Sequence, residues 1–257
     1  MRRIRCIVEY DGTDYVGWQV QPNGVSVQQR INEALLALTG ETGIQAHGSG
    51  RTDSGVHALA QVFHFDTDAR MPAEKFAVAM NTHLPGDIRM LYSGETDGDF
   101  HARFSAKEKT YRYTLQLGPY ARVFTRDTAL HIHTPLSLPP MEEAARNVVG
   151  EHDFRGFMCA DTAMEQTVRT VLRSAWRQDG VYLHYEVTGT GFLYNMVRIL
   201  AGTMLDIGMG RYGPERMEKA LLSGNREDAG PTAPAKALTL IRVRYPDFDT
   251  DEVLNSL

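Results

Sequence analysis

The chain has 257 residues, 42% hydrophobic and 23% charged, which is typical of a globular protein with one large domain or two smaller ones. Its two cysteines, Cys6 and Cys159, are far apart and do not fit a disulfide framework, so we expect a cytoplasmic protein. We expect neither a signal peptide nor a membrane span, because the most apolar stretch, residues 187–205, contains Arg198 near its middle.

The first hundred residues are predicted to run strand, helix, strand, helix, strand. Hydrophobic periodicity and turn residues place these elements at residues 4–10, 26–40, 61–66, 72–85 and 87–95. Ser26 is the expected N-cap of the first helix, and Gly40 is expected to end it. The segment GSGRTDSGVHA, residues 48–58, falls in the loop before the second strand.

The rest of the chain repeats this order loosely. A strand (110–117), a helix (139–150), a hairpin (167–178 with 181–189), two helices (191–208 and 213–224) and a final strand (238–245) are predicted. Helices interspersed with strands that have one polar face indicate an α+β fold with mainly antiparallel sheets. We predict two halves, residues 1–104 and 105–257. The acidic tail, residues 247–257, is the one segment whose composition suggests disorder.

Charge is unevenly distributed along the chain. The net charge of −5 argues weakly against nucleic-acid binding, but residues 101–126 carry six cations and a single acidic residue, Glu108. The cations are Arg103, Lys107, Lys109, Arg112, Arg122 and Arg126. Phosphate binding depends on the local field, so this stretch is a candidate RNA-binding surface, and a solvated basic face is the alternative.

Two charged residues, Asp53 and Arg198, are candidate functional residues because of their sequence neighbours. Asp53 follows Arg51 by two residues among glycines, and it can either cap a turn or, kept ionised by a cation, serve as a nucleophile or base. Arg198 is the only formal charge in residues 187–205, and a buried guanidinium requires an anion. That anion can be a structural carboxylate elsewhere or one in a site, for which Asp53 is the obvious candidate.

Tyr111 begins a predicted strand and shares a face with Tyr113 and Leu115. Periodicity favours a core tyrosine. Its place beside the basic stretch favours a ring that stacks on a base or a phenol that handles a proton. No metal site is expected, because His131 and His133 lack further ligands at suitable spacing.

Five motifs, in order, resemble the tRNA pseudouridine synthases of the TruA family over nearly the whole chain. They are YDGTDYVGWQVQ (10–21), SGRTDSGVHA (49–58), FHARFSAKEKTYRY (100–113), GFLYNMVRILAG (191–202) and AGPTAPAKALTLIRVRYP (229–246). Ser54 stands where that family most often has alanine. The resemblance implies an isomerase that converts uridine to pseudouridine in the anticodon stem-loop, at positions 38, 39 and 40 of tRNA. It also implies a homodimer, no cofactor, and two related halves with an active-site cleft between them.

The resemblance also implies roles for four residues. Asp53 is the essential nucleophile, Tyr111 stacks on the target base, and Arg198 pairs with the aspartate. Arg51 helps to displace or replace the uridine in the RNA helix. Two other classes of function remain open on the residues alone. One is a non-catalytic RNA-binding module, which does not need the charge of Asp53. The other is a carboxylate hydrolase, which needs a second acid and releases a free base.

Overall fold

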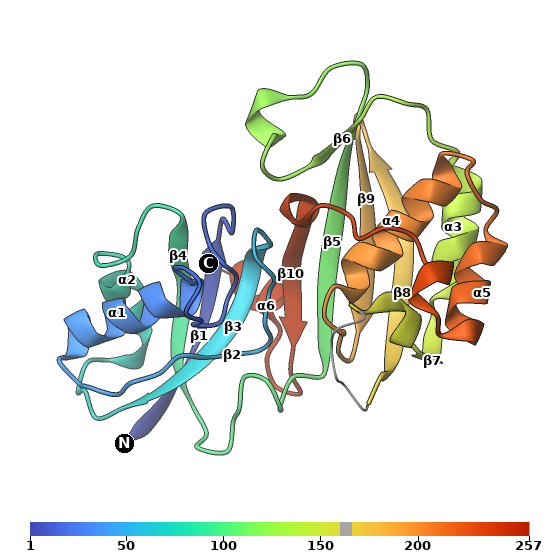
Figure 1. Ribbon diagram of the computed structural model, residues 1–257. Coiled ribbons are helices and arrows are strands. Elements are labelled where there is room, and N and C mark those ends of the chain that lie inside the picture. Colours follow the sequence, from blue (N-terminus) through green and yellow to red (C-terminus); the bar gives the residue numbers. More distant parts are fainter. Residues whose placement is uncertain (160–165, 257) are drawn as a thin grey trace. The chain divides into compact units, whose positions relative to one another are not determined.

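The computed structural model describes residues 1–159 and 166–256, which form two compact units (Figure 1). Unit 1 comprises Met1–Lys107 and Thr239–Leu257, and unit 2 comprises Glu108–Leu238. The predicted halves, 1–104 and 105–257, therefore differ from the units mainly at the C-terminus. The final strand belongs with unit 1 because it pairs in parallel with a strand there, with Thr239 opposite His57 and Leu240 opposite Ala58.

Unit 1 contains a mixed sheet and three α-helices. Its elements are β1 (Arg2–Tyr10), α1 (Val27–Thr39), β2 (His47–Gly48), β3 (His57–Thr67), α2 (Phe76–Met80), β4 (Ile88–Thr96), β10 (Leu238–Arg244) and α6 (Thr250–Leu254). The strand order is β4–β1–β3–β10, with β2 beside β3. β1 is antiparallel to both of its neighbours. Aromatic residues such as Phe63, Phe65 and Phe76 fill the core of this unit.

Local signals in the first helix act as predicted. The hydroxyl of Ser26 accepts a hydrogen bond from the backbone N–H of Gln29 at 3.2 Å, and Gly40 ends α1 with φ of 71°. The second helix is shorter than the predicted range, residues 72–85. α2 covers only residues 76–80, after a 3₁₀ turn, η1 (Ala73–Lys75).

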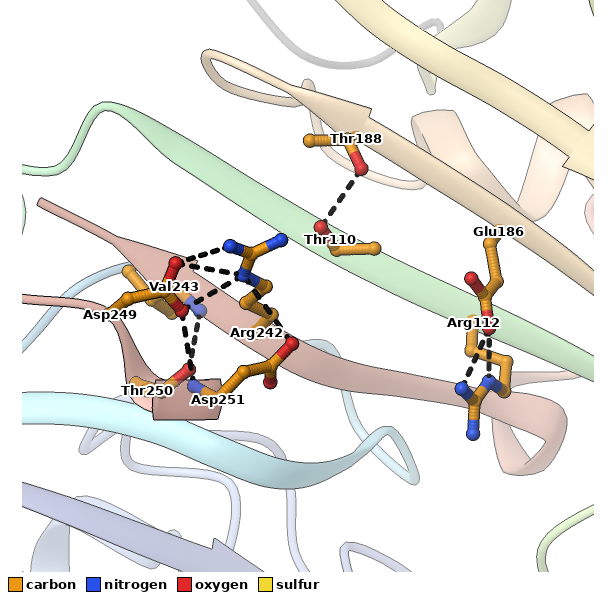
Figure 2. Close-up of polar contacts among 9 residues, drawn as sticks. All are labelled: Thr110, Arg112, Glu186, Thr188, Arg242, Val243, Asp249, Thr250 and Asp251. Carbon is orange, nitrogen blue, oxygen red and sulfur yellow. Dashed lines mark hydrogen bonds and ion pairs between the residues drawn. The ribbon is translucent and has the colours of Figure 1, made fainter. Parts of the chain in front are cut away.

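The acidic tail is ordered in the described residues, contrary to what its composition suggests. Arg242 on β10 is paired with Asp249, the N-cap of α6, and lies 3.4 Å from a carboxylate oxygen of Asp251 (Figure 2). The backbone N–H of Val243 donates to the Thr250 hydroxyl at 3.0 Å. These contacts tie the end of the chain to the sheet of unit 1, and the acidic side chains act as partners for a cation and a helix N-terminus.

Unit 2 contains the remaining strands, which are mainly antiparallel, and three α-helices in its described residues. Its elements are β5 (Glu108–Leu117), β6 (Leu130–Ile132), α3 (Leu138–Asn147), β7 (Gly150–Asp153), β8 (Val168–Asp179), β9 (Tyr182–Gly189), α4 (Met196–Gly208) and α5 (Glu215–Ser223). Short 3₁₀ turns lie at Val123–Thr125 (η2), Arg155–Phe157 (η3), Arg226–Asp228 (η4) and Ala235–Ala237 (η5). The strand order is β5–β9–β8–β7, and β6 runs parallel to β5.

The two faces of the β5–β9 strand pair differ in polarity. On one face, the hydroxyls of Thr110 and Thr188 are 2.9 Å apart and Arg112 is paired with Glu186 (Figure 2). The alternate residues Tyr113 and Leu115 are fully buried. The predicted hairpin is present, with Gly180 at φ of 58° in its turn. The predicted α+β class is confirmed. No helix in residues 1–159 and 166–256 is long and apolar enough to cross a membrane.

Candidate active site

The segment that carries Asp53 is the loop between β2 and β3 in unit 1. Thr52 is buried, the side chain of Asp53 is half-buried, and Arg51 is exposed. The backbone N–H of Val56 donates to the carbonyl of Asp53 at 3.1 Å, which closes a tight turn. Gly55 has φ of 76° within this turn, a conformation that glycine adopts at little cost.

The first motif, residues 10–21, packs against this loop and forms hydrogen bonds with it. The hydroxyl of Tyr10 and that of Thr52 are 2.8 Å apart, and the Trp18 backbone N–H donates to the Thr52 carbonyl at 3.1 Å. The Tyr15 carbonyl accepts from the Gly55 N–H at 3.3 Å. These contacts fix the backbone on both sides of Asp53.

Close backbone approach explains two glycines of the first motif. A Cβ at Gly17 would lie 2.5 Å from the Thr52 carbonyl oxygen, and Gly17 also has φ of 105°. A Cβ at Gly12 would lie 2.0 Å from the Val56 carbonyl oxygen. The first two motifs are therefore one packed substructure in which the chain at 12 and 17 touches the loop directly.

Two supporting residues were not singled out in the sequence. The Nδ1 atom of buried His57 accepts the backbone N–H of Gly12 at 3.0 Å and lies 3.1 Å from Asp11 Oδ1. With its lone pair free, Nδ1 accepts from Gly12, and with a proton on it, Nδ1 donates to Asp11, so one ring position serves either partner of the first motif. The Tyr15 hydroxyl donates to Asp87 at 2.8 Å. Their membership of the motifs was the only sequence signal for them.

In unit 2, Tyr111 lies on β5 opposite Val187 of β9. Its side chain is 8% exposed, and its ring meets the Phe192 ring edge-on, with centroids 5.3 Å apart. Phe192 belongs to the fourth motif, so the third and fourth motifs meet at this tyrosine. The burial agrees with a core role, and the stacking role of Tyr111, the fourth residue of β5, stays a prediction.

Arg198 is the third residue of α4, and its guanidinium is oriented by neighbours within unit 2. Its Nε donates to the Ala233 carbonyl at 2.8 Å and its Nη1 donates to Asn195 Oδ1 at 2.8 Å. In return, the Ala233 N–H donates to the Arg198 carbonyl at 3.1 Å. Every other residue of α4 is buried, as the apolar pattern predicts. The helix begins five residues later than predicted, because Asn195 has φ of 62°.

The fifth motif supports this arginine through close packing on α4. A Cβ at Gly202 would lie 1.9 Å from the Pro231 carbonyl oxygen, so only glycine admits the segment 229–234 against the helix. The Gly230 N–H donates to the Thr203 hydroxyl at 2.8 Å.

The four predicted site residues divide between the two units. Asp53 and Arg51 belong to unit 1, and Tyr111 and Arg198 belong to unit 2. The pairing of Asp53 with Arg198 stays a prediction.

Comparison with known proteins decides the family. The chain matches the tRNA pseudouridine synthase family over residues 6–105 and 144–246. It is 46% identical over 245 residues to the tRNA pseudouridine synthase A of Brevibacillus brevis, covering 95% of this chain and 100% of that one. The chain belongs to the tRNA pseudouridine synthase family.

Further relatives agree with this assignment. The tRNA pseudouridine synthase A of Geobacillus kaustophilus is 44% identical over 246 residues, covering 96% of this chain and 95% of that one. That of Bacillus subtilis is 43% identical over 244 residues, covering 95% of this chain and 99% of that one. The protein is therefore an isomerase that acts on uridine in tRNA. The described residues contain no group of three or more His, Cys, Asp or Glu side chains that could hold a metal ion.

Proposed function

We propose that this synthase converts uridine to pseudouridine in the anticodon stem-loop of tRNA, at positions 38, 39 and 40, with Asp53 as the nucleophile. The observation that carries the proposal is the anchoring of the Asp53 loop through Thr52, Gly55 and Val56. A carboxylate on a backbone fixed in this way needs little reorganisation to reach a reacting atom, which is what nucleophilic catalysis requires.

The reaction exchanges one bond to the ribose for another. The target uridine leaves the base stack, at a cost of a few kcal/mol, before a side chain can reach it. The N1–C1′ bond breaks, the detached base turns, and C5 bonds to C1′. The proton on C5 is then lost and N1 gains one, so the product is an isomer. No electrons are transferred and no co-reactant is needed, which agrees with the expectation of no cofactor.

The remaining roles follow from the chemistry of the side chains. Ionised Asp53 adds to the sugar or the ring, or stabilises positive charge at C1′ as a glycosidase carboxylate does. The ring of Tyr111 keeps the detached base from escaping while it turns. Arg198 pairs with the carboxylate because a guanidinium stays protonated and binds a carboxylate with two N–H groups. Exposed Arg51 fills the place that the uridine leaves in the RNA helix.

We also propose that the enzyme acts as a homodimer in the cytoplasm. The resemblance supports the dimer, and two unpaired cysteines, Cys6 and Cys159, agree with a reducing compartment. Light scattering should give twice the chain mass of 28.7 kDa. A mass equal to that of one chain would contradict the dimer.

Mapping the product in tRNA tests the proposed substrate site. Transcribed tRNA is incubated with the enzyme, treated with a carbodiimide that marks pseudouridine, and read by reverse transcription. We expect stops at positions 38–40 and at no other uridine. Stops elsewhere would contradict the assignment. Free uracil on chromatography would indicate the hydrolase, and unmodified but bound tRNA would indicate the binding module.

A further inference from the structure

The connection between β5 and β6 in unit 2 presents large apolar side chains to solvent. Tyr120 is 82% exposed, Val123 68% and Phe124 99%. Phe124 lies in the 3₁₀ turn η2, at the centre of the connection. We call residues 118–128 the aromatic loop. Neighbouring exposed apolar side chains of this size usually mark an interaction site.

The aromatic loop is held in one conformation by the strands at its base. The side-chain amide of Gln116, at the end of β5, donates to the carbonyls of Leu117 (2.8 Å) and Tyr120 (3.2 Å). Its oxygen accepts the N–H of Arg122 at 3.0 Å. Gln116 itself is only 3% exposed. A loop ordered by buried contacts presents its aromatic rings without a large loss of entropy on binding.

Cations alternate with the aromatic residues in this loop. Tyr120, Arg122, Phe124 and Arg126 follow one another at a spacing of two residues. Lys236 adds a third cation, because its Nζ donates to the Arg126 carbonyl at 2.8 Å. The opposing charge within residues 118–128 is Asp127, which is paired with Arg126 in an exposed position. Stacking rings among cations bind single-stranded nucleic acid in a sequence-tolerant way.

A second copy of the chain fits this surface less well. If two copies met through the same loop, Arg122, Arg126 and Lys236 of each would approach those of the other. Like charges in such an interface are unfavourable. RNA phosphates, in contrast, complement the net positive charge that these three cations keep beside Asp127. The charge pattern therefore favours RNA as the occupant.

The geometry of β5 places this surface away from the reacting base. Tyr111 and Gly118 are separated by seven residues along the strand and its end, which corresponds to about 23 Å. A span of this length is several times the thickness of one stacked base. The aromatic loop therefore contacts a different part of the RNA from the one held at Tyr111.

We propose that the aromatic loop is a second RNA contact of this synthase, with Phe124 and Tyr120 stacking on unpaired bases of tRNA and Arg122 contacting phosphate. This inference rests on the proposed stacking role of Tyr111 only for the distance between the two contacts. The loop contributes to holding tRNA and takes no part in bond exchange.

The test compares Phe124→Ala with Leu222→Ala. Leu222 is 81% exposed on α5 of the same unit and lies outside the aromatic loop, so it controls for removal of an exposed apolar side chain. The dissociation constant of a full-length tRNA is measured by fluorescence anisotropy. We expect Phe124→Ala to weaken binding at least about fivefold, the loss of one stacked base, with kcat at saturating tRNA unchanged. Leu222→Ala should match the parent.

Salt dependence gives an independent readout. Arg122→Ala should reduce the slope of log Kd against log salt by about 0.7 to 1, the loss of one phosphate contact. Unchanged affinity in Phe124→Ala, or an unchanged slope in Arg122→Ala, would overturn the proposal. A loss of dimer mass in Phe124→Ala with unchanged tRNA affinity would assign the loop to a second copy instead. Binding is measured without turnover, so these outcomes do not depend on the role of Asp53.

Discussion

Arg198 uses two of its N–H groups on Asn195 and on the Ala233 carbonyl, so its guanidinium has a fixed orientation within unit 2. The apolar pattern of the helix identifies this arginine as unusual. The pattern does not identify the hydrogen-bond partners of Arg198. The Ala233 carbonyl is 35 residues away in sequence, and neither composition nor periodicity depends on such a distant contact. Asp53 and Tyr111 are similar cases. Their roles come from the resemblance, since periodicity alone favours a turn residue and a core ring.

The proposed pairing of Asp53 with Arg198 predicts an energetic coupling. Arg198→Ala alone should lower turnover at least about tenfold and lower the free energy of unfolding by about 1–3 kcal/mol, because it also strands the Ala233 carbonyl. In the Asp53→Asn background the same change should cost less. A double-mutant cycle in urea measures the difference, expected at about 0.5–3 kcal/mol. Normal melting and normal turnover of Arg198→Ala would refute the pairing.

His64 on β3 should make stability depend on pH. Burial lowers its pKa from 6.5 to about 4, and the charges of Arg3, His101 and His47 add to the effect. Its Nδ1 accepts the Ala102 N–H at 3.1 Å, which needs the unprotonated ring nitrogen. In the unfolded chain, His64 therefore binds a proton below about pH 6.5. In the folded chain, it binds this proton only below about pH 4.

The expected result is a free energy of unfolding that falls as the pH is lowered from about 6.5 to about 4, by as much as about 3 kcal/mol. His64→Gln should lose this part of the pH dependence, while His133→Gln, a change at an exposed histidine, should keep it. Urea unfolding at several pH values makes the comparison. Identical pH profiles for His64→Gln and the parent would contradict the assignment.

Among the elements, those with strong local signals were predicted well. The cap at Ser26 and the predicted hairpin, with Gly180 in its turn, act through neighbours in sequence, so the pattern contains the information. The short strands β6 and β7 were missed because three or four residues hold too little periodicity and depend on partners elsewhere in the sheet. Helix α6 was missed because the acidic residues around it suggested disorder, whereas Arg242 binds them.

The packing of the first motif on the Asp53 loop predicts a selective effect of Gly17→Ala. A Cβ there meets the Thr52 carbonyl at 2.5 Å and φ is 105°, so the loop must move. We expect a stability loss of about 1–3 kcal/mol and a loss of turnover of at least about tenfold. Gly43→Ala is the matched control, because φ is 90° there and no atom lies within 4 Å. It should destabilise the protein and leave turnover per folded molecule unchanged. Equal turnover of the two variants would contradict the positioning role.

For the whole molecule, the sequence predicted the α+β class; it placed the boundary between halves after residue 104, and the first segment of unit 1 ends at Lys107. It did not reveal that the chain returns to unit 1 at Thr239, because the pairing of β10 with β3 joins segments about 180 residues apart. The motifs also divide between the units. The first two build the Asp53 loop in unit 1, and the fourth and the start of the fifth build the surroundings of Arg198 in unit 2.

The most direct test is the release of tritium from tRNA labelled at C5 of uridine, measured for the parent enzyme and for Asp53→Asn. This substitution keeps the size of the side chain and removes its charge. We expect no detectable release by the variant, with a tRNA dissociation constant within a few fold of that of the parent. Release at the parent rate would show that the Asp53 carboxylate does not carry the chemistry.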